Sequence, residues 1–324
     1  MPFKGEPVRS PSWLPTLFSE PWDLGSSAIA RTLKHARTAR GLNPLRVFGL
    51  QVRALEFCSD DGVRLDAWYL PAAKRVDAVS PGCVVLHHHY GGQKATLLPW
   101  LEFFHRKGFD ALCFDARGHG ASGPSPEGRG SFVHRAADVR AACNKARDLG
   151  AQQIIAFGQS QGAAALVMGI HDRDDVVACI VDSGPAPDMA SAAWGLAGNM
   201  LGRLAGERPV ARALLSARIL PGTHPLLYQA ALWQALFGLR SRPLLWIHGA
   251  RDRVIPRQSA SLWFKLLRPA GQLWQGVEVA HAEHVRCLAV GGVELEVQVE
   301  DFLARAGLGL PSLGQPTEKE VERL

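Results

Sequence analysis

The chain has 324 residues, of which 47% are apolar and 20% are charged, and its formal net charge is +6. This composition excludes wholesale disorder and is enough for one large α/β domain with an insertion, or for two small domains. The sequence holds no apolar run long enough to span a bilayer and no signal peptide at its first residues, so we expect a cytoplasmic protein.

The first 50 residues form a predicted N-terminal helical extension, which carries most of the positive charge. Residues 1–55 hold eight basic side chains and three acidic ones, so the rest of the chain is nearly neutral. Residues 26–41 have the pattern of a helix with one broad basic face, formed by Arg31, Lys34, Arg37 and Arg40. Such a face can bind an anionic membrane surface, but the apolar side of this helix is weak, and we favour packing on the domain. We expect no nucleic-acid partner.

Beyond residue 50, strand-like and helix-like segments alternate. Two strand-like runs, 52–58 and 63–69, flank an Asp-Gly pair, which predicts a hairpin. Further strands are predicted at 83–86, 109–114, 154–157, 176–181, 243–248 and 273–279, and helices at 97–107, 132–149, 258–267 and 293–304. This alternation predicts an α/β fold with a mostly parallel central sheet and helices on both of its faces.

Residues 184–240 interrupt the alternation with a helical, mostly apolar block. A block of this kind between two strands would lie near the C-terminal edge of the sheet, so we predict a helical cap over the functional site. The core of the domain would then consist of residues 51–183 and 241–310. The polar residues 311–324 are predicted to form a flexible tail.

Ser160 is the strongest candidate for a catalytic residue. It lies at the centre of Gly158-Gln159-Ser160-Gln161-Gly162, between an apolar run and an alanine-rich segment. Strand, tight turn and helix in this order expose the serine hydroxyl at the tip of the turn, while the flanking glycines allow close packing. The adjacent helix N-terminus would stabilise a developing negative charge. A serine hydroxyl needs a neighbouring base, so an acid and a histidine should follow downstream.

Four segments together resemble the α/β-hydrolase superfamily, most closely its serine esterase and peptidase-like branch with a helical cap. They are residues 84–92, 114–122, 158–162 and 248–256, and the resemblance runs from about residue 52 to residue 303. It implies the α/β-hydrolase fold, with Asp252 in the position of the acid that orients the catalytic histidine. Asp182, at the end of the preceding strand, is the alternative acid, since some branches carry theirs there.

The resemblance favours His284 as the base. The segment Ala282-Glu283-His284 matches the family pattern of a small residue, any residue and histidine. His281, three positions earlier, is the alternative. The order Ser160, Asp252, His284 agrees with the order of these groups in the superfamily.

The resemblance also implies an oxyanion hole made by the backbone N–H groups of Tyr90 and Gln161. His89 stands where relatives usually have glycine, so the family pattern does not predict the geometry of this loop. Neighbouring side chains of an extended chain point to opposite faces, so the consecutive His87, His88 and His89 cannot all bind one ion, and we expect no metal. The resemblance implies a structural role for Arg117 and His119.

These residues predict acyl transfer to water without a cofactor. The apolar cap favours a small-molecule carboxylic ester with an apolar acyl group as the substrate. The alternatives are hydrolysis of an amide or peptide bond, transfer of the acyl group to another acceptor, and non-catalytic binding on the same fold. The oligomeric state is left open.

Overall fold

The computed structural model describes residues 44–72, 82–125, 132–186, 209–219, 225–271 and 273–308, together with residues 188, 190, 193, 194 and 197. The predicted helix over residues 26–41 and the predicted tail 311–324 lie outside these described residues. No helix in the described part of the chain is long and apolar enough to cross a membrane.

The centre of the molecule is an eight-stranded sheet with the order β1-β2-β4-β3-β5-β6-β7-β8. Its strands are β1 (Arg53–Cys58), β2 (Arg64–Leu70), β3 (Cys83–His87), β4 (Asp110–Phe114), β5 (Ile154–Gln159), β6 (Val176–Asp182), β7 (Leu244–Gly249) and β8 (Trp274–Val279). The pairs β1–β2 and β2–β4 are antiparallel, and the remaining pairs are parallel. The predicted hairpin and the mostly parallel sheet are both confirmed.

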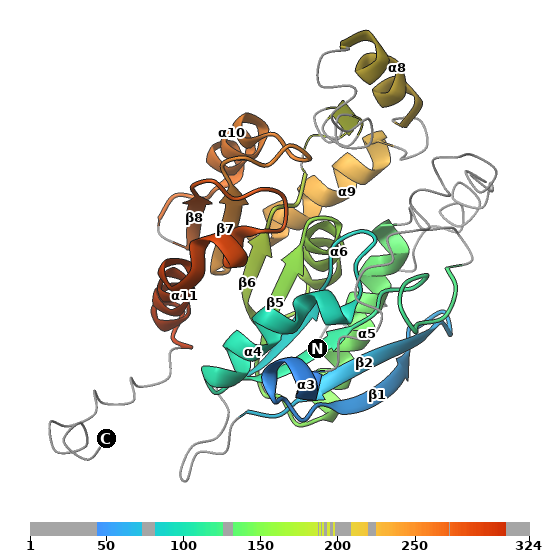
Figure 1. The fold of residues 1–324 in the computed structure, drawn as a ribbon, viewed down its shortest axis with the longest axis vertical. Helices are drawn as coiled ribbons and strands as arrows, with labels where there is room; N and C mark the ends of the chain where they lie inside the picture. Colours follow the sequence, from blue (N-terminus) through green and yellow to red (C-terminus); the bar gives the residue numbers. More distant parts are fainter. Residues whose placement is uncertain are drawn as a thin grey trace, which may run out of the picture.

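Helices cover both faces of this sheet (Figure 1). One face packs against α5 (Phe132–Asp148), α6 (Gln161–Ile170), α9 (Pro225–Gly238) and α10 (Arg257–Leu267), and the other against α4 (Leu98–Arg106) and α11 (Cys287–Arg305). Alternate residues of β3 serve the two layers, with Val85 in one and Val84 in the other. Because both faces are covered, β3 and β5 are buried along their whole length, which explains their continuous apolar sequences.

Some element boundaries differ from the predicted ones. A short helix, α3 (Pro44–Phe48), precedes β1, and a 3₁₀ turn, η2 (Lys94–Leu97), precedes α4. Helix α11 begins at Cys287, six residues before the predicted start, and continues across Gly292 at φ 49°. The predicted helix 293–304 is thus the second of two helical pieces, which are joined across a kink at Gly292.

Within the predicted cap, the structure gives the helices α8 (Pro209–Ile219) and α9, and a 3₁₀ turn, η5 (Leu239–Ser241), follows α9. In Figure 1, α9 lies beside α6, and α8 lies beyond it, away from the sheet. Leu232, Ala235 and Leu236 of α9 are buried in the same core cluster as α6. The second half of α9 is therefore part of the domain core, while the covering role of the block remains a prediction.

The parallel strands place their C-terminal ends along one edge of the sheet. His87 of β3 pairs with Gly158 of β5, and Gln159 pairs with Asp182 of β6. The segments after these strands therefore meet at this edge, which is where open α/β sheets bind their ligands.

Candidate active site

Ser160 occupies a sharp turn between β5 and α6. Its backbone has φ 54° and ψ −118°, a left-handed conformation that L-residues rarely adopt. The Ser160 N–H donates to the carbonyl oxygen of Asp182 at 2.9 Å, and the Ala163 N–H donates to the Ser160 carbonyl at 3.0 Å. These bonds fix the turn and leave the side chain at its tip, as the sequence predicts.

The two glycines of the motif are required by close approaches. A Cβ atom on Gly158 would lie 2.8 Å from Ala163 Cα, and one on Gly162 would lie 2.6 Å from His87 Nδ1. Both separations are too short for real contacts, so any side chain here would push α6 away from the sheet. Gly184 has a similar role after β6, because its Cβ atom would lie 2.7 Å from the Ser160 carbonyl oxygen.

Asp252 lies in the loop after β7 and is buried. Its Oδ1 accepts the backbone N–H groups of Val254 at 2.8 Å and Ile255 at 2.9 Å. Its Oδ2 lies 2.7 Å from His284 Nδ1. One carboxylate oxygen therefore anchors the side chain to its own loop, and the other faces the histidine.

His284 lies in the loop after β8 and joins the other two side chains. Its Nε2 lies 2.8 Å from Ser160 Oγ, while its Nδ1 faces Asp252. An imidazole that donates from Nδ1 to a carboxylate presents a free lone pair on Nε2 to the hydroxyl. The alternative base, His281, is exposed with φ 66° on the preceding turn, so the structure brings together the favoured histidine and not the alternative.

Asp182, the alternative acid, is fully buried, and its carboxylate oxygens bind Gln159 and Ser183. Its Oδ2 accepts Gln159 Nε2 at 2.9 Å, and its Oδ1 accepts the Ser183 hydroxyl at 2.9 Å. Burial raises the pKa of Asp182 from its ordinary value. Ser183 Oγ in turn accepts the Val285 N–H at 2.9 Å, so Asp182 and Ser183 hold the loop that carries His284.

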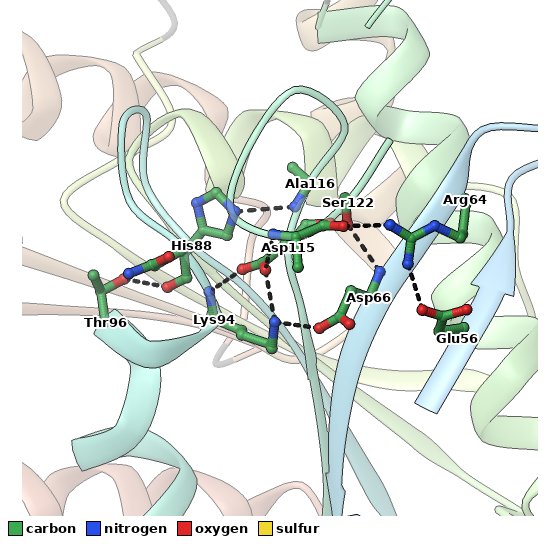
Figure 2. Close-up of polar contacts among 11 residues, drawn as sticks. Glu56, Arg64, Asp66, His88, Lys94, Thr96, Asp115, Ala116 and Ser122 are labelled. Carbon is green, nitrogen blue, oxygen red and sulfur yellow. Dashed lines mark hydrogen bonds and ion pairs between the residues drawn. The ribbon is translucent and has the colours of Figure 1, made fainter. Parts of the chain in front are cut away.

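The loop after β3 is fixed by histidines in the neutral form. His88 Nδ1–H donates to the His89 carbonyl at 2.7 Å. Its Nε2 accepts the Ala116 N–H at 3.0 Å, as Figure 2 shows. His119 Nδ1–H donates to the Arg117 carbonyl at 3.0 Å, and its Nε2 accepts the Gly91 N–H at 3.3 Å. Burial lowers the pKa of His88 well below its ordinary value, and the neighbouring His87 and His119 act in the same direction.

His89 fits this loop without a left-handed backbone, because Gly91 takes the positive φ of 73° instead. Gly92 provides the space for its ring, since a Cβ atom there would lie 2.9 Å from His89 Cε1. Burial, together with the charge of His284, lowers the pKa of His89 to about 4. The residue that replaces the usual glycine is therefore accommodated by the two glycines that follow it.

A buried ion-pair cluster supports the start of η2 (Figure 2). Lys94 Nζ contacts Asp66 and lies 2.6 Å from Asp115 Oδ2, and the Lys94 backbone N–H donates to Asp115 Oδ1 at 2.6 Å. Burial would lower the pKa of Lys94, but the ion pairs with Asp115 and Asp66 outweigh it and raise that pKa. The cluster joins the loop after β3 to β2 and to the loop after β4.

Arg117 has the structural role that the sequence predicts. Its buried guanidinium binds Asp138 of α5, with Nε 2.9 Å from Oδ1, and Asp61 of the first hairpin, with Nη1 2.6 Å from Oδ2. It therefore links the β1–β2 turn to the helix that precedes β5.

Comparison with known proteins gives matches in sequence and in structure. A family model described as serine aminopeptidase, S33, matches residues 79–223. The uncharacterized protein YfhR of Escherichia coli K12 is 26% identical over 261 residues, which is 78% of this chain and 81% of that protein. YfhR of Salmonella typhimurium LT2 is 22% identical over 228 residues, covering 68% of this chain and 72% of that protein.

The solved structures include the Pyrococcus furiosus esterase Pf2001, with a TM-score of 0.62 and 21% identity over 81% of this chain and 93% of that one. They also include the α/β hydrolase GrgF from Penicillium sp. sh18, with a TM-score of 0.57 and 19% identity over 79% of this chain and 99% of that one. The chain therefore has the fold of the α/β-hydrolases. The fold that the sequence motifs predict is thereby confirmed.

In the part of the chain that the structure describes, no group of three His, Cys, Asp or Glu side chains could hold a metal ion. Both ring nitrogens of His88 are already used in hydrogen bonds to backbone groups. The run of histidines after β3 thus contributes to the structure of the loop.

Several residues that shape the candidate site were not found by sequence reasoning. Lys94, Asp66 and Asp115 form their cluster across three separate segments, and Ser183 binds a residue 102 positions later in the chain. No motif with a short residue spacing predicts contacts between segments so far apart in the sequence. Asp115 lies within a segment that resembles the superfamily, and this was the one available signal.

Proposed function

We propose that this chain is a serine hydrolase of the α/β-hydrolase superfamily that cleaves a carboxylic ester or a related acyl bond through an acyl-enzyme. One observation carries the proposal: Ser160 Oγ, His284 and Asp252 form a continuous line of contacts of 2.8 Å and 2.7 Å. A hydroxyl, an imidazole and a buried carboxylate in this arrangement supply a nucleophile, a base and an orienting group.

In the first half of the reaction, Ser160 Oγ attacks the carbonyl carbon of the substrate and transfers its proton to His284 Nε2. Asp252 keeps the imidazole in the required tautomer and stabilises the imidazolium. The carbonyl electron pair moves onto oxygen, and the N–H groups of Tyr90 and Gln161 are the proposed donors to this oxyanion. Collapse of the intermediate breaks the bond to the leaving group, which takes the proton from His284.

In the second half, water attacks the acyl carbon of the ester formed with Ser160. His284 accepts a proton from this water and then returns it to Ser160 Oγ as the second intermediate collapses. The acid is released and the serine regains its hydroxyl. The helix N-terminus of α6 beside Ser160 favours the negative charge in both steps.

An ester with an apolar acyl group is the first choice of substrate. Solved structures that resemble this chain include an esterase from Pyrococcus furiosus and a thermophilic esterase from Thermogutta terrifontis. The apolar composition of residues 184–240 supports the apolar acyl group. An amide or peptide bond is the second choice, because the matching family model is described as a serine aminopeptidase.

The test is a panel of p-nitrophenyl esters of increasing acyl length, with an aminopeptidase substrate alongside and a fluorophosphonate as covalent probe. We expect ester hydrolysis, labelling of the wild type, and loss of both in Ser160→Ala. A wild type that neither reacts with the probe nor turns over any substrate would contradict the proposal and favour a binding protein. Labelling that persists in Ser160→Ala would identify another nucleophile.

A further inference from the structure

Arg135 of α5 is a buried cation next to the candidate active site. Its side chain is among the largest fully buried ones in the described residues, with 1% relative exposure. Burying a guanidinium costs several kcal/mol unless its donors and charge are compensated. The contacts that compensate it therefore indicate what the surrounding structure uses it for.

Two of these contacts go to the two residues that carry the proposed oxyanion donors. Arg135 Nη1 donates to Oε1 of Gln161, the residue that follows the nucleophile. The guanidinium carbon of Arg135 also lies 5.7 Å from the ring centroid of Tyr90, within the range of a cation–π contact. One side chain thus touches both the first turn of α6 and the loop after β3.

The Tyr90 ring is held by a second neighbour as well. The ring of His119 lies edge-on to it at 5.9 Å between centroids, and the same histidine accepts the N–H of Gly91. The loop after β3 is therefore fixed by His119, while Arg135 joins this loop to the turn that carries Ser160. The two segments are far apart in sequence, and their backbone N–H groups must converge on one oxygen atom to be useful.

We propose that Arg135 is a positioning residue that sets the spacing between the N–H groups of Tyr90 and Gln161. This inference rests on the proposed function, because it assigns a role in stabilising the oxyanion of that reaction. The guanidinium does not need to touch the substrate. It acts through its contacts with the side chains of both donor residues. A displacement of about 1 Å in such groups costs on the order of 100-fold in rate.

The experiment compares Arg135→Gln, Arg135→Lys and Gln161→Met with the wild type. Gln161→Met keeps the backbone N–H but removes the oxygen that accepts from Arg135. Arg140→Gln is the matched control, since Arg140 is on the same helix and its ion pair with Asp172 is at the surface. Each variant is assayed for kcat and KM on a p-nitrophenyl ester, for its unfolding midpoint, and for inhibition by a trifluoromethyl ketone, which forms a tetrahedral adduct with the serine.

We expect kcat to fall roughly 10- to 100-fold in Arg135→Gln with little change in KM, and affinity for the ketone to weaken by a similar factor. Arg135→Lys should recover part of the loss, because an ammonium group can still donate to Gln161 and lie over Tyr90. Arg140→Gln should behave as the wild type does. If Arg135→Gln is recovered only unfolded, Gln161→Met carries the test and should show the same loss in kcat.

Folded variants with unchanged kcat and ketone affinity would overturn the inference. So would a fall in the unfolding midpoint with no change in ketone affinity, because that pattern describes a packing residue. A wild type that binds no ketone and cleaves no ester would instead overturn the proposed function, and the inference with it. The two failures are thus distinguished by the behaviour of the wild type.

Discussion

Ser160, His284 and Asp252 form one line of hydrogen-bonding contacts, and mutation can break each link separately. The residues come from three loops that follow β5, β8 and β7, so their contact depends on the whole sheet rather than on local sequence. The two histidine candidates differ in this respect, since His284 faces both partners and His281 is exposed.

We predict that His284→Ala lowers kcat on a p-nitrophenyl ester by at least about 10³-fold, because the serine then has no base. His281→Ala should change kcat by only a small factor. The measurement is steady-state kinetics of both variants at one pH, with circular dichroism to show that both are folded. An inactive His281→Ala variant together with an active His284→Ala variant would mean that His281 is the base.

The cluster of Lys94, Asp66 and Asp115 binds three segments of the fold together. We predict that Lys94→Met destabilises the protein by about 3–5 kcal/mol, because it leaves the fully buried Asp115 carboxylate without its cation. The control is Arg64→Met, which removes the exposed ion pair with Glu56 shown in Figure 2 and should cost no more than about 1 kcal/mol. Urea unfolding of the three proteins measures both values, and equal costs would refute the importance of burial here.

The sequence predicted the strands and the long helices well, because their apolar patterns and glycine stops are local signals. It also ranked Asp252 above Asp182 and His284 above His281, and the structure brings the higher-ranked pair to Ser160. It did not predict Arg135 as a neighbour of Tyr90 and Gln161. Contacts of this kind join segments 26 or more residues apart, and no periodicity or motif encodes them.

Acid should destabilise the molecule as a whole through its buried neutral histidines. Burial lowers the pKa of His87 to about 3, whereas an unfolded chain protonates histidine near pH 6.5. Below that pH, the unfolded state binds a proton that the folded state does not, so stability falls as the pH decreases toward 3. The pKa values of His88 and His89 are also lowered by burial, so these two residues add to the loss of stability in acid.

We predict that one such buried histidine lowers the free energy of unfolding by roughly 2 kcal/mol when the pH decreases from 7 to 5. The measurement is urea unfolding of the wild type, His87→Gln and His105→Gln at pH 7, 6 and 5. His87→Gln should lose less stability on acidification, and His105→Gln, which changes a residue of α4 near the surface, should match the wild type. Identical pH dependence in all three would exclude His87 as a source of acid sensitivity.

The left-handed backbone of Ser160 sets a trade-off between stability and activity. A non-glycine residue in such a conformation costs about 1–3 kcal/mol, and the fold supplies that energy to expose one hydroxyl. Glycine adopts this conformation freely and costs only about 0.5–1 kcal/mol in chain entropy. Ser160→Gly and Ser160→Ala should therefore be equally inactive, but Ser160→Gly should unfold at the higher urea concentration. If the alanine variant is the more stable one, the turn is not held at an energetic cost, and the protein gives up no stability for its nucleophile.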